Sequence, residues 1–497
     1  MTVPALSVST SLPSALEADV LVVGVRQGDD GAVVTSTDEA VTGLLSGLDL
    51  RALGVTGAED ELVRLPADAV TATIVATVGL GRTVDADALR YAAGSAVRQL
   101  TAVDRVALDL PVTSEDEARA ALEGAALGAY AFDAFRGSSA GEQRRHASDV
   151  VLATGVEVQE AAVTTAATVA QAVHTVRDLS NTPPQQLAPA DLAGAAVSLA
   201  ADLDLEVEVL AEDALREGGY GGILGVGQGS SRGPRLVKLT WSPEGATKHL
   251  ALVGKGITYD TGGLSLKPAA SMLGMKDDMT GAATVLAATV AIARLALPVK
   301  VTTWLCVAEN MPSGTAIRPD DVLTIRGGTT VEVTNTDAEG RLVMADGLVA
   351  ASEEQPDMIV DVATLTGAQV VALGTRTAGV MGNDGFADSV VAAADATGET
   401  AWRMPLPREL RARLSSDVAD LVNATPGNTA AGMLLAGVFL REFVGDREGG
   451  EGQIPWAHVD IAGPSNNKAG GYGYTPKGST GVAVRTLLGL AADVAAG

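Results

Sequence analysis

The chain has 497 residues, a formal net charge of −26, a single cysteine and only 3% aromatic residues. This length exceeds what one hydrophobic core normally supports, the single cysteine excludes a disulfide within the chain, and the acidic balance opposes general binding to nucleic-acid phosphates. No apolar run reaches the ~18 residues of a membrane span, and residues 1–13 lack the basic and apolar regions of a secretory signal, so we expect a cytoplasmic protein without a membrane partner.

Apolar and helical stretches alternate through the first part of the chain. The apolar runs span residues 18–25, 72–78 and 105–110, and the helical stretches span residues 36–53, 86–100 and 114–135. Such alternation is typical of an α/β domain with a mostly parallel sheet. An alanine-rich helix is expected over residues 159–179, before the helix-breaking pair Pro183-Pro184. We therefore place a smaller amino-terminal α/β domain over residues 1–165.

Residues 166–497 repeat this alternation. Strand-like runs at residues 205–210, 235–241, 299–307 and 358–362 are separated by helical stretches. The pattern predicts a larger carboxy-terminal α/β domain with a central mixed sheet flanked by helices. We expect this domain to be the catalytic one, because the two segments that contain the candidate site residues lie in it.

The first such segment follows the apolar run at residues 249–253, which predicts a buried strand. The strand is expected to end in a glycine-rich loop that carries Lys255, Asp260 and Lys267. Functional side chains gather at such strand ends in α/β folds. Asp278 then precedes a run of small residues and is expected in the first turn of a helix, where the helix dipole alone would favour an acid.

The second segment, Asn335 to Leu342, reads NTDAEGRL and contains two carboxylates one residue apart. In an extended or tightly looped chain, Asp337 and Glu339 project to the same side and can converge on one point. Two converging carboxylates repel each other unless a cation lies between them. Arg341 could supply part of that charge, so a solvated loop with a local ion pair is the alternative to a metal site.

Read together, the two segments closely resemble signatures of the leucine aminopeptidase (cytosol aminopeptidase) family of dinuclear metallopeptidases. The matching blocks are VGKGITYDTGG, SLKP and MKDDM over residues 253–279, and NTDAEGRL over residues 335–342. The likeness extends through residues 178–184, 361–368, 456–464 and 477–481. It covers roughly residues 170–490, whereas the first ~165 residues are similar to the family only in length and α/β pattern.

The resemblance implies that two divalent metal ions bind to each subunit. The implied ligands are Lys255, Asp260, Asp278, Asp337 and Glu339. Asp260 and Glu339 would bridge the ions, Lys255 and Asp278 would complete the tighter site, and Asp337 would complete the more exchangeable one. Oxygen-rich ligation with one amine suits manganese or zinc, and also magnesium or cobalt. The chain has no H-E-x-x-H pair, and one cysteine cannot form a cysteine cluster.

The resemblance also implies which residues act on the substrate. Lys267 would stabilise the oxyanion formed at the peptide carbonyl, and Arg341 would hold a bicarbonate that relays a proton from a metal-bridging water. The substrate-binding positions implied by the family are Met275, Thr364, Leu365 through its carbonyl, Gly367 and Ala462. His458 is expected to be a core or strand-end histidine without a catalytic role, because no charged residue lies at ligand spacing beside it.

The implied protein is a cytosolic leucyl aminopeptidase, a metallo-exopeptidase. It would release amino-terminal residues, preferentially leucine and other medium apolar residues, from short peptides, and it would assemble as a homohexamer. A nucleic-acid-binding regulatory or architectural protein on the same scaffold is the alternative. The negative charge opposes it, although a basic strip at Arg144-Arg145-His146 could act locally.

Overall fold

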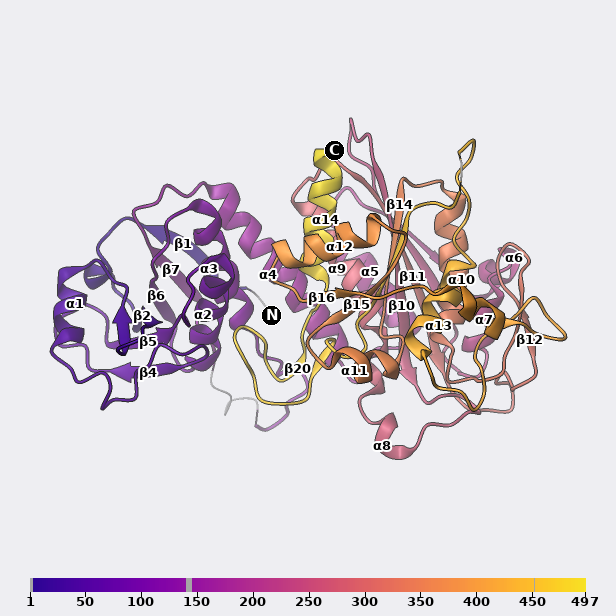
Figure 1. Ribbon diagram of the computed structural model, residues 1–497, viewed down its shortest axis with the longest axis horizontal. Coiled ribbons are helices and arrows are strands. Elements are labelled where there is room, and N and C mark those ends of the chain that lie inside the picture. Colours follow the sequence, from indigo (N-terminus) through magenta and orange to yellow (C-terminus); the bar gives the residue numbers. More distant parts are fainter. Residues whose placement is uncertain (1–2, 140–144, 451) are drawn as a thin grey trace. The chain divides into compact units, whose positions relative to one another are not determined.

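The computed structural model describes residues 3–139, 145–450 and 452–497, and the chain forms two compact units (Figure 1). The first unit comprises Met1–His174 together with Asn467–Gly478, and the second comprises Thr175–Asn466 and Ser479–Gly497. The predicted boundary after residue 165 falls inside helix α4 (Glu160–Asn181). The chain returns to the first unit near its carboxy-terminal end, between strands β19 (Asn466–Asn467) and β20 (Gly478–Ser479).

The first unit contains a seven-stranded sheet in the order β1-β7-β6-β2-β5-β4, with β3 paired to β2. The pairs β1–β7, β7–β6, β6–β2 and β2–β5 are parallel, whereas β3 and β4 pair antiparallel, so the predicted mostly parallel sheet is confirmed. The strands are β1 (Ala5–Ser9), β2 (Val20–Gln27), β3 (Ala32–Val34), β4 (Leu62–Leu65), β5 (Ile74–Gly79), β6 (Arg105–Asp109) and β7 (Asp149–Ala153).

Helices cover both faces of this sheet. Along β2, Val20 and Val22 pack into the core under α2 (Ala86–Gln99) and α3 (Glu115–Gly128). The alternate residues Leu21 and Val23 pack into the core under α1 (Glu39–Ser46), as the two-residue period of a strand requires. Helix α1 is shorter than the predicted stretch 36–53. It begins after Asp38, whose side chain accepts a hydrogen bond from the Ala40 amide, and it ends before a glycine.

The second unit contains an eight-stranded mixed sheet in the order β16-β15-β18-β14-β10-β11-β9-β8. The pairs β10–β11, β10–β14, β14–β18 and β15–β16 are parallel, and the other three pairs are antiparallel, which confirms the predicted central mixed sheet. The strands are β8 (Glu206–Leu210), β9 (Arg235–Trp241), β10 (His249–Asp260), β11 (Lys300–Asn310), β14 (Met358–Ala363), β15 (Ala378–Gly382), β16 (Ala401–Arg403) and β18 (Trp456–Asp460).

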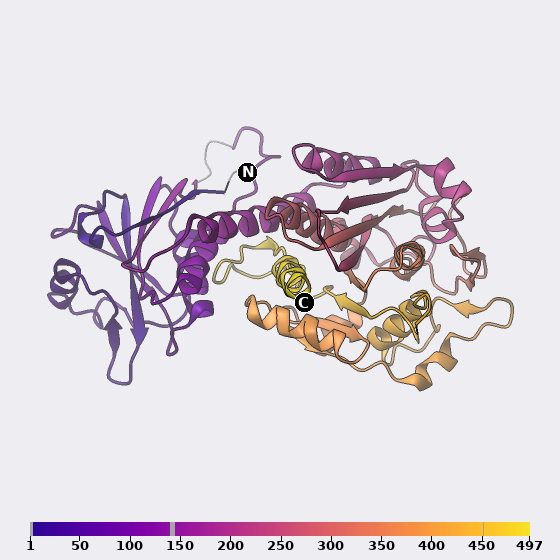
Figure 2. The same ribbon diagram turned by 90° about the horizontal axis from the view of Figure 1, so that it is seen from above.

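Helices flank this second sheet as predicted, and Figure 2 shows them packed along it. The helices of this unit include α5 (Pro189–Ala200), α6 (Glu212–Glu217), α7 (Gly221–Gly227), α9 (Thr280–Arg294), α10 (Gly340–Glu353), α11 (Gly367–Leu373), α12 (Phe386–Ala396), α13 (Gly432–Arg441) and α14 (Val484–Ala496), whereas the short α8 (Ala269–Met272) lies in the loop that follows β10. A separate small sheet of this unit consists of β12 (Val322–Thr324), β13 (Thr330–Glu332) and β17 (Leu421–Val422). The 3-10 helices Met275–Met279 (η3) and Arg408–Leu414 also lie in this unit, whereas the 3-10 helix Pro13–Ala15 lies in the first unit. Within the described residues, no helix is both long and apolar enough to cross a bilayer.

Strand β10 differs from its prediction because it does not end at Val253. It continues to Asp260, through the glycines that suggested a loop. A Cβ on Gly254 would lie 2.6 Å from the Cα of Ala282 on α9, so this glycine permits close helix packing. On the opposite face, a Cβ on Gly347 of α10 would lie 2.8 Å from Val253. The two helices therefore pack on opposite faces of the strand that carries Lys255 and Asp260.

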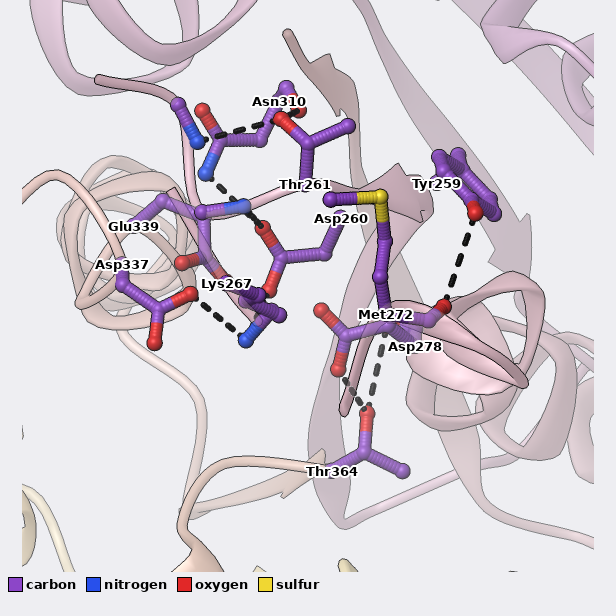
Figure 3. Close-up of polar contacts among 12 residues, drawn as sticks. Tyr259, Asp260, Thr261, Lys267, Met272, Asp278, Asn310, Asp337, Glu339 and Thr364 are labelled. Carbon is purple, nitrogen blue, oxygen red and sulfur yellow. Dashed lines mark hydrogen bonds and ion pairs between the residues drawn. The ribbon is translucent and has the colours of Figure 1, made fainter. Parts of the chain in front are cut away.

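The predicted position of Asp278 also needs correction. Asp278 lies in η3, and α9 begins two residues later at Thr280. It is therefore not a first-turn acid of α9. Its carboxylate instead faces the site at the edge of the sheet (Figure 3).

A histidine at the start of β10 makes folding stability depend on pH. Burial, and then the nearby charge of Lys300, lower the pKa of His249 from its ordinary 6.5 to about 4. Its Nε2 lies 2.9 Å from the Thr302 hydroxyl oxygen. Below pH 6.5 the ring becomes protonated in the unfolded state, whereas in the folded state it stays neutral down to about pH 4. The stability that His249 contributes is therefore complete above pH 6.5 and is lost as the pH falls towards 4.

We therefore expect His249→Gln to lose less unfolding free energy than the unmodified protein between pH 7 and pH 4.5. Chemical denaturation at both pH values measures the two losses. Carboxylates contribute to both proteins alike, so their effect cancels in the difference. Equal losses in the two proteins would contradict the assignment.

Candidate metal centre

Charged side chains from four segments of the second unit meet at the carboxyl ends of the parallel strands β10, β11 and β14. They come from β10 (Lys255 and Asp260), the loop after it (Lys267), η3 (Asp278) and the loop before α10 (Asp337 and Glu339). Figure 3 shows all of them except Lys255. The carboxyl ends of parallel strands meet at one edge of a sheet, so a shared topology gathers segments that are distant in sequence.

Carboxylates and ammonium groups alternate in this cluster. Lys255 Nζ lies 2.6 Å from Asp278 Oδ2 and 2.9 Å from Glu339 Oε1. Lys267 Nζ lies 2.8 Å from Asp260 Oδ2 and 2.6 Å from Asp337 Oδ1. Carboxylate oxygens of Asp260, Asp337 and Glu339 all lie within 4.8 Å of one another. The structure therefore brings together all five predicted metal ligands and the predicted catalytic lysine.

The cluster carries more negative than positive charge. Four carboxylates face two ammonium groups, so two negative charges are left over when all six groups are ionised. Burial raises the pKa of Asp278 to about 8, which shows the cost of holding that negative charge here without a further cation. Burial raises the pKa of Asp260, and the neighbouring Glu339 raises it further, against the two lysines. Burial also opposes the charged form of Lys255, but Asp278, Glu339 and Asp260 outweigh it and raise the pKa of that lysine. Such a site favours the binding of further positive charge.

The available donor atoms suit divalent cations. Glu339 is almost fully buried, and its Oε2 has no hydrogen-bond partner in the part of the chain that the structure describes. A buried carboxylate oxygen without a partner is costly, and a cation would satisfy it. Hard oxygen donors with one nearby nitrogen fit ions such as manganese or zinc. Asp337 and Glu339 form their ion pairs with lysines, so the alternative of a solvated loop paired to Arg341 is not supported.

Arg341 lies beside this cluster, in the first turn of α10. Its Nη1 donates a 2.7 Å hydrogen bond to the Asn423 carbonyl, and its guanidinium carbon lies 5.9 Å from the Phe439 ring centre. Burial lowers the pKa of Arg341 to about 10, against the attraction of Glu339 and Asp460, so the group stays charged at neutral pH. Its Nε is buried without a hydrogen-bond partner among the described residues.

The predicted substrate-binding residues do not form one group. The Thr364 hydroxyl donates to Asp278 Oδ1 at 2.7 Å, and the Thr364 carbonyl accepts from Lys255 Nζ at 3.1 Å, so this residue supports the charged cluster itself. One carboxylate oxygen of Asp460 accepts from the amides of Leu365 and Ala462, which places these two positions together. Separately, Met275 begins η3, and the exposed Gly367 begins α11.

Three supporting residues escaped the sequence analysis: Asn310, Asn423 and Asp460. Asn310 ends β11 and donates to Asp260, whereas Asn423 holds Arg341 through its carbonyl. Amide side chains carry no charge pattern that a sequence reveals. Asp460 had one available signal, because it lies within a segment similar to the family, at the end of a strand.

The expectation for His458 was right about burial and wrong about its surroundings. The ring is fully buried on β18, but its Nδ1 lies 2.5 Å from Asp361 Oδ1 on the neighbouring strand β14. Burial disfavours the charged ring, yet Asp361 raises the pKa of His458 above its ordinary value. The partner faces it across the sheet, where Asp361 pairs with His458 in register, so spacing along the sequence could not show it.

The basic strip that favoured nucleic-acid binding gains no support. Arg144 lies outside the described residues. Burial lowers the pKa of His146, and its Nδ1 lies 3.2 Å from the Val97 carbonyl oxygen, so it offers little positive charge.

Comparisons with known proteins agree with this geometry over almost the whole chain. The model of the catalytic domain of the cytosol aminopeptidase family matches residues 174–488, and the model of its N-terminal domain matches residues 22–139. A probable cytosol aminopeptidase of Clavibacter michiganensis is 59% identical, and one of Leifsonia xyli is 58% identical, each alignment covering 99% of both chains.

Two solved structures are similar as well. The bottromycin maturation enzyme BotP in complex with Mn has a TM-score of 0.85 and 38% identity, covering 96% of this chain and 100% of its own. A mutant of tomato leucine aminopeptidase has a TM-score of 0.85 and 30% identity, covering 99% of this chain and 97% of its own.

A glycine at the start of α10 leaves room for the Lys255 side chain. A Cβ on Gly340 would lie 2.5 Å from Lys255 Cε. We expect Gly340→Ala to displace the lysine from Asp278 and Glu339 and to lower the unfolding free energy by about 1–3 kcal/mol, as overpacking typically does. Urea denaturation measures the change.

Gly43→Ala is the matched control. This exposed glycine lies within α1, and an added Cβ would meet no atom within 4 Å, so the change should be neutral or stabilising by up to about 1 kcal/mol. The same stabilisation in both variants would show that Lys255 is not confined by Gly340.

Proposed function

The chain belongs to the cytosol aminopeptidase family and is a metallo-aminopeptidase, and we propose that it releases amino-terminal residues from short peptides in the cytoplasm, preferring leucine and other medium apolar residues. One observation carries the proposal. Carboxylate oxygens of Asp260, Asp337 and Glu339 gather within 4.8 Å of one another at a sheet edge that has an excess of negative charge.

We infer that the cluster holds two divalent ions. Asp260 and Glu339 would bridge them, Lys255 and Asp278 would complete the tighter site, and Asp337 would complete the more exchangeable one. The unpartnered Glu339 oxygen supports a bridging role, and the contact of Lys255 with Asp278 supports their shared site. A dication at that position would favour the neutral amine of Lys255 over its ammonium form. Manganese and zinc both suit these donors, and the Mn complex of BotP supports manganese.

When bound, two such ions polarise a peptide carbonyl and lower the pKa of a water molecule. The chain itself supplies the remaining charge. Lys267 points into the cluster and would stabilise the oxyanion that develops on the attacked carbonyl. Arg341 would hold a bicarbonate ion as proton relay, which its charge and its unpartnered buried Nε support.

Substrate orientation follows from the residues around Asp278. Asp278 can accept a hydrogen bond from a free α-amine, which an internal peptide bond lacks, so the site favours chain ends. The Leu365 carbonyl would bind the substrate main chain. Thr364, Ala462, Gly367 and Met275 would surround the first side chain, and a flexible methionine suits medium apolar residues.

Removing a bridging carboxylate tests the metal assignment. We expect Glu339→Ala to abolish peptide hydrolysis and to lose at least one of two bound ions, because Glu339 would contact both. Elemental analysis and a leucine-amide assay measure the two effects. Glu353→Ala, at the last residue of the helix that follows Glu339, removes a half-exposed carboxylate that pairs with Arg326, and it should keep both metal and activity. Full metal content and activity in Glu339→Ala would contradict the dinuclear centre.

The two predicted catalytic cations should behave differently from the ligands. We expect Lys267→Ala and Arg341→Ala to retain metal while kcat falls. For Lys267→Ala the activation free energy should rise by about 2–4 kcal/mol, as it does when an oxyanion donor is removed. Lys248→Ala, at an exposed position, is the matched control. Loss of metal from Lys267→Ala would reassign that residue as a ligand.

We also propose a homohexamer with its active sites facing an internal cavity that admits short peptides and excludes folded proteins. The many alanines and glycines of the chain suit close packing between subunits. Light scattering should give about 300 kDa, six times the chain mass of 50.1 kDa. A fully active species of 50.1 kDa, or rapid trimming of a folded protein, would refute this assembly.

A further inference from the structure

A buried asparagine joins the two loops that carry the metal-binding carboxylates. Asn310 is the last residue of β11 and is only 2% exposed. Its side-chain nitrogen donates to Asp260 Oδ1 at 2.8 Å (Figure 3) and to the Thr336 carbonyl at 3.1 Å. One amide therefore contacts Asp260 directly and contacts the chain immediately before Asp337.

The contact with Asp260 fixes how that carboxylate is turned. Asp260 Oδ1 accepts from Asn310 and, at 2.8 Å, from the amide of Gly262. Its other oxygen is left to face Lys267 at 2.8 Å. Asp260 pairs with Asn310 in register across β10 and β11, after a bulge between Ile257 and Asp260 that redirects the strand end. Two donors on one oxygen thus hold the other towards the centre of the cluster.

The contact with Thr336 fixes the second loop against the first. The Thr336 hydroxyl donates to the Gly262 carbonyl at 2.6 Å and accepts from the Ser265 amide at 2.7 Å. The approach is close: a Cβ on Gly263 would lie 2.8 Å from Asn310 Oδ1. The described residues 333–339 form no strand or helix. Side-chain hydrogen bonds therefore hold this loop in place of the backbone hydrogen bonds of regular secondary structure.

The tighter half of the cluster is held by other groups. Asp278 is fixed by Lys255 and by the Thr364 hydroxyl, and neither of its contacts involves Asn310. Asn310 therefore acts on Asp260, which would contribute to both metal sites, and through Thr336 on Asp337, which would contribute to the more exchangeable site alone. Partners that orient a metal ligand commonly change affinity by about 10- to 100-fold when they are removed.

We propose that Asn310 is a positioning residue that sets the spacing between Asp260 and Asp337, and so controls the affinity of the more exchangeable metal site more strongly than that of the tighter site. This inference rests on the proposed function, because it requires two unequal sites. Its signature is a larger change in the weaker binding class than in the tighter one, because only the weaker site would use both Asp260 and Asp337. General destabilisation of the domain would weaken both classes together.

Calorimetric titration of Mn²⁺ into the metal-free full chain tests the proposal. Asn310→Ala should weaken the weaker binding class at least tenfold and the tighter class by a clearly smaller factor. Asn310→Asp, which preserves size but removes both donors, should do the same, and it serves as the test if the alanine variant fails to fold. Asn467→Ala is the matched control, because this buried asparagine also donates to two carbonyls, those of Gly470 and Pro476.

Equal weakening of both classes, or no weakening of either, in a folded Asn310 variant would overturn the proposal. Tighter binding in Asn310→Asp would also overturn it, because added charge and not carboxylate spacing would then govern the site. If the unmodified chain binds no pair of Mn²⁺ ions, the dinuclear function fails along with this inference. Two classes in the unmodified chain with unchanged Asn310 variants would refute the inference alone.

Discussion

Unbalanced charge at the edge of the second sheet is the constraint on which the rest of the site depends. Four carboxylates are held against two ammonium groups, and most of these side chains are buried. Such an arrangement costs folding free energy, because buried like charges repel one another and have lost their water. It persists only where the surrounding fold fixes every member, and cations that bind there relieve the repulsion.

Close packing of helices on strands holds these charged side chains in place. A Cβ on Gly281 of α9 would lie 2.2 Å from the Val362 carbonyl of β14, and Gly254 and Gly340 leave similarly little room. The absence of side chains at these three positions lets two helices press directly against the strands that carry the ligands. Hydrogen bonds from Asn310 and Asn423 then join the loops to this frame. Both the backbone and the side chains of the site are therefore held from several directions.

Local patterns in the sequence predicted much of this. Strand β9 has the predicted bounds, Arg235 to Trp241, and the other predicted strands differ from the observed ones mainly at their ends. The two charged segments meet at one edge of the sheet, as the resemblance of their motifs to a known family implied. These predictions succeeded because hydrophobic alternation and short motifs are properties of neighbouring residues.

The failures concern residues that meet only through the sheet. The length of β10 depends on its pairing with β11 as far as Asn310, and the partner of His458 depends on its register with Asp361. The place of residues 467–478 in the first unit depends on long-range contacts as well. The sequence did not indicate a role for Asn310, because a neutral amide side chain acquires its role from the residues that it contacts in the folded chain. Periodicity along one segment contains no information about register with another.

Diffraction from crystals grown with Mn²⁺, recorded with anomalous scattering, tests the central claim most directly. The account predicts two manganese peaks per chain, about 3.5–4 Å apart, with Asp260 and Glu339 contacting both and Asp337 contacting one. A single peak, or none with Lys255 still paired to both Asp278 and Glu339, would contradict a dinuclear centre built from these carboxylates.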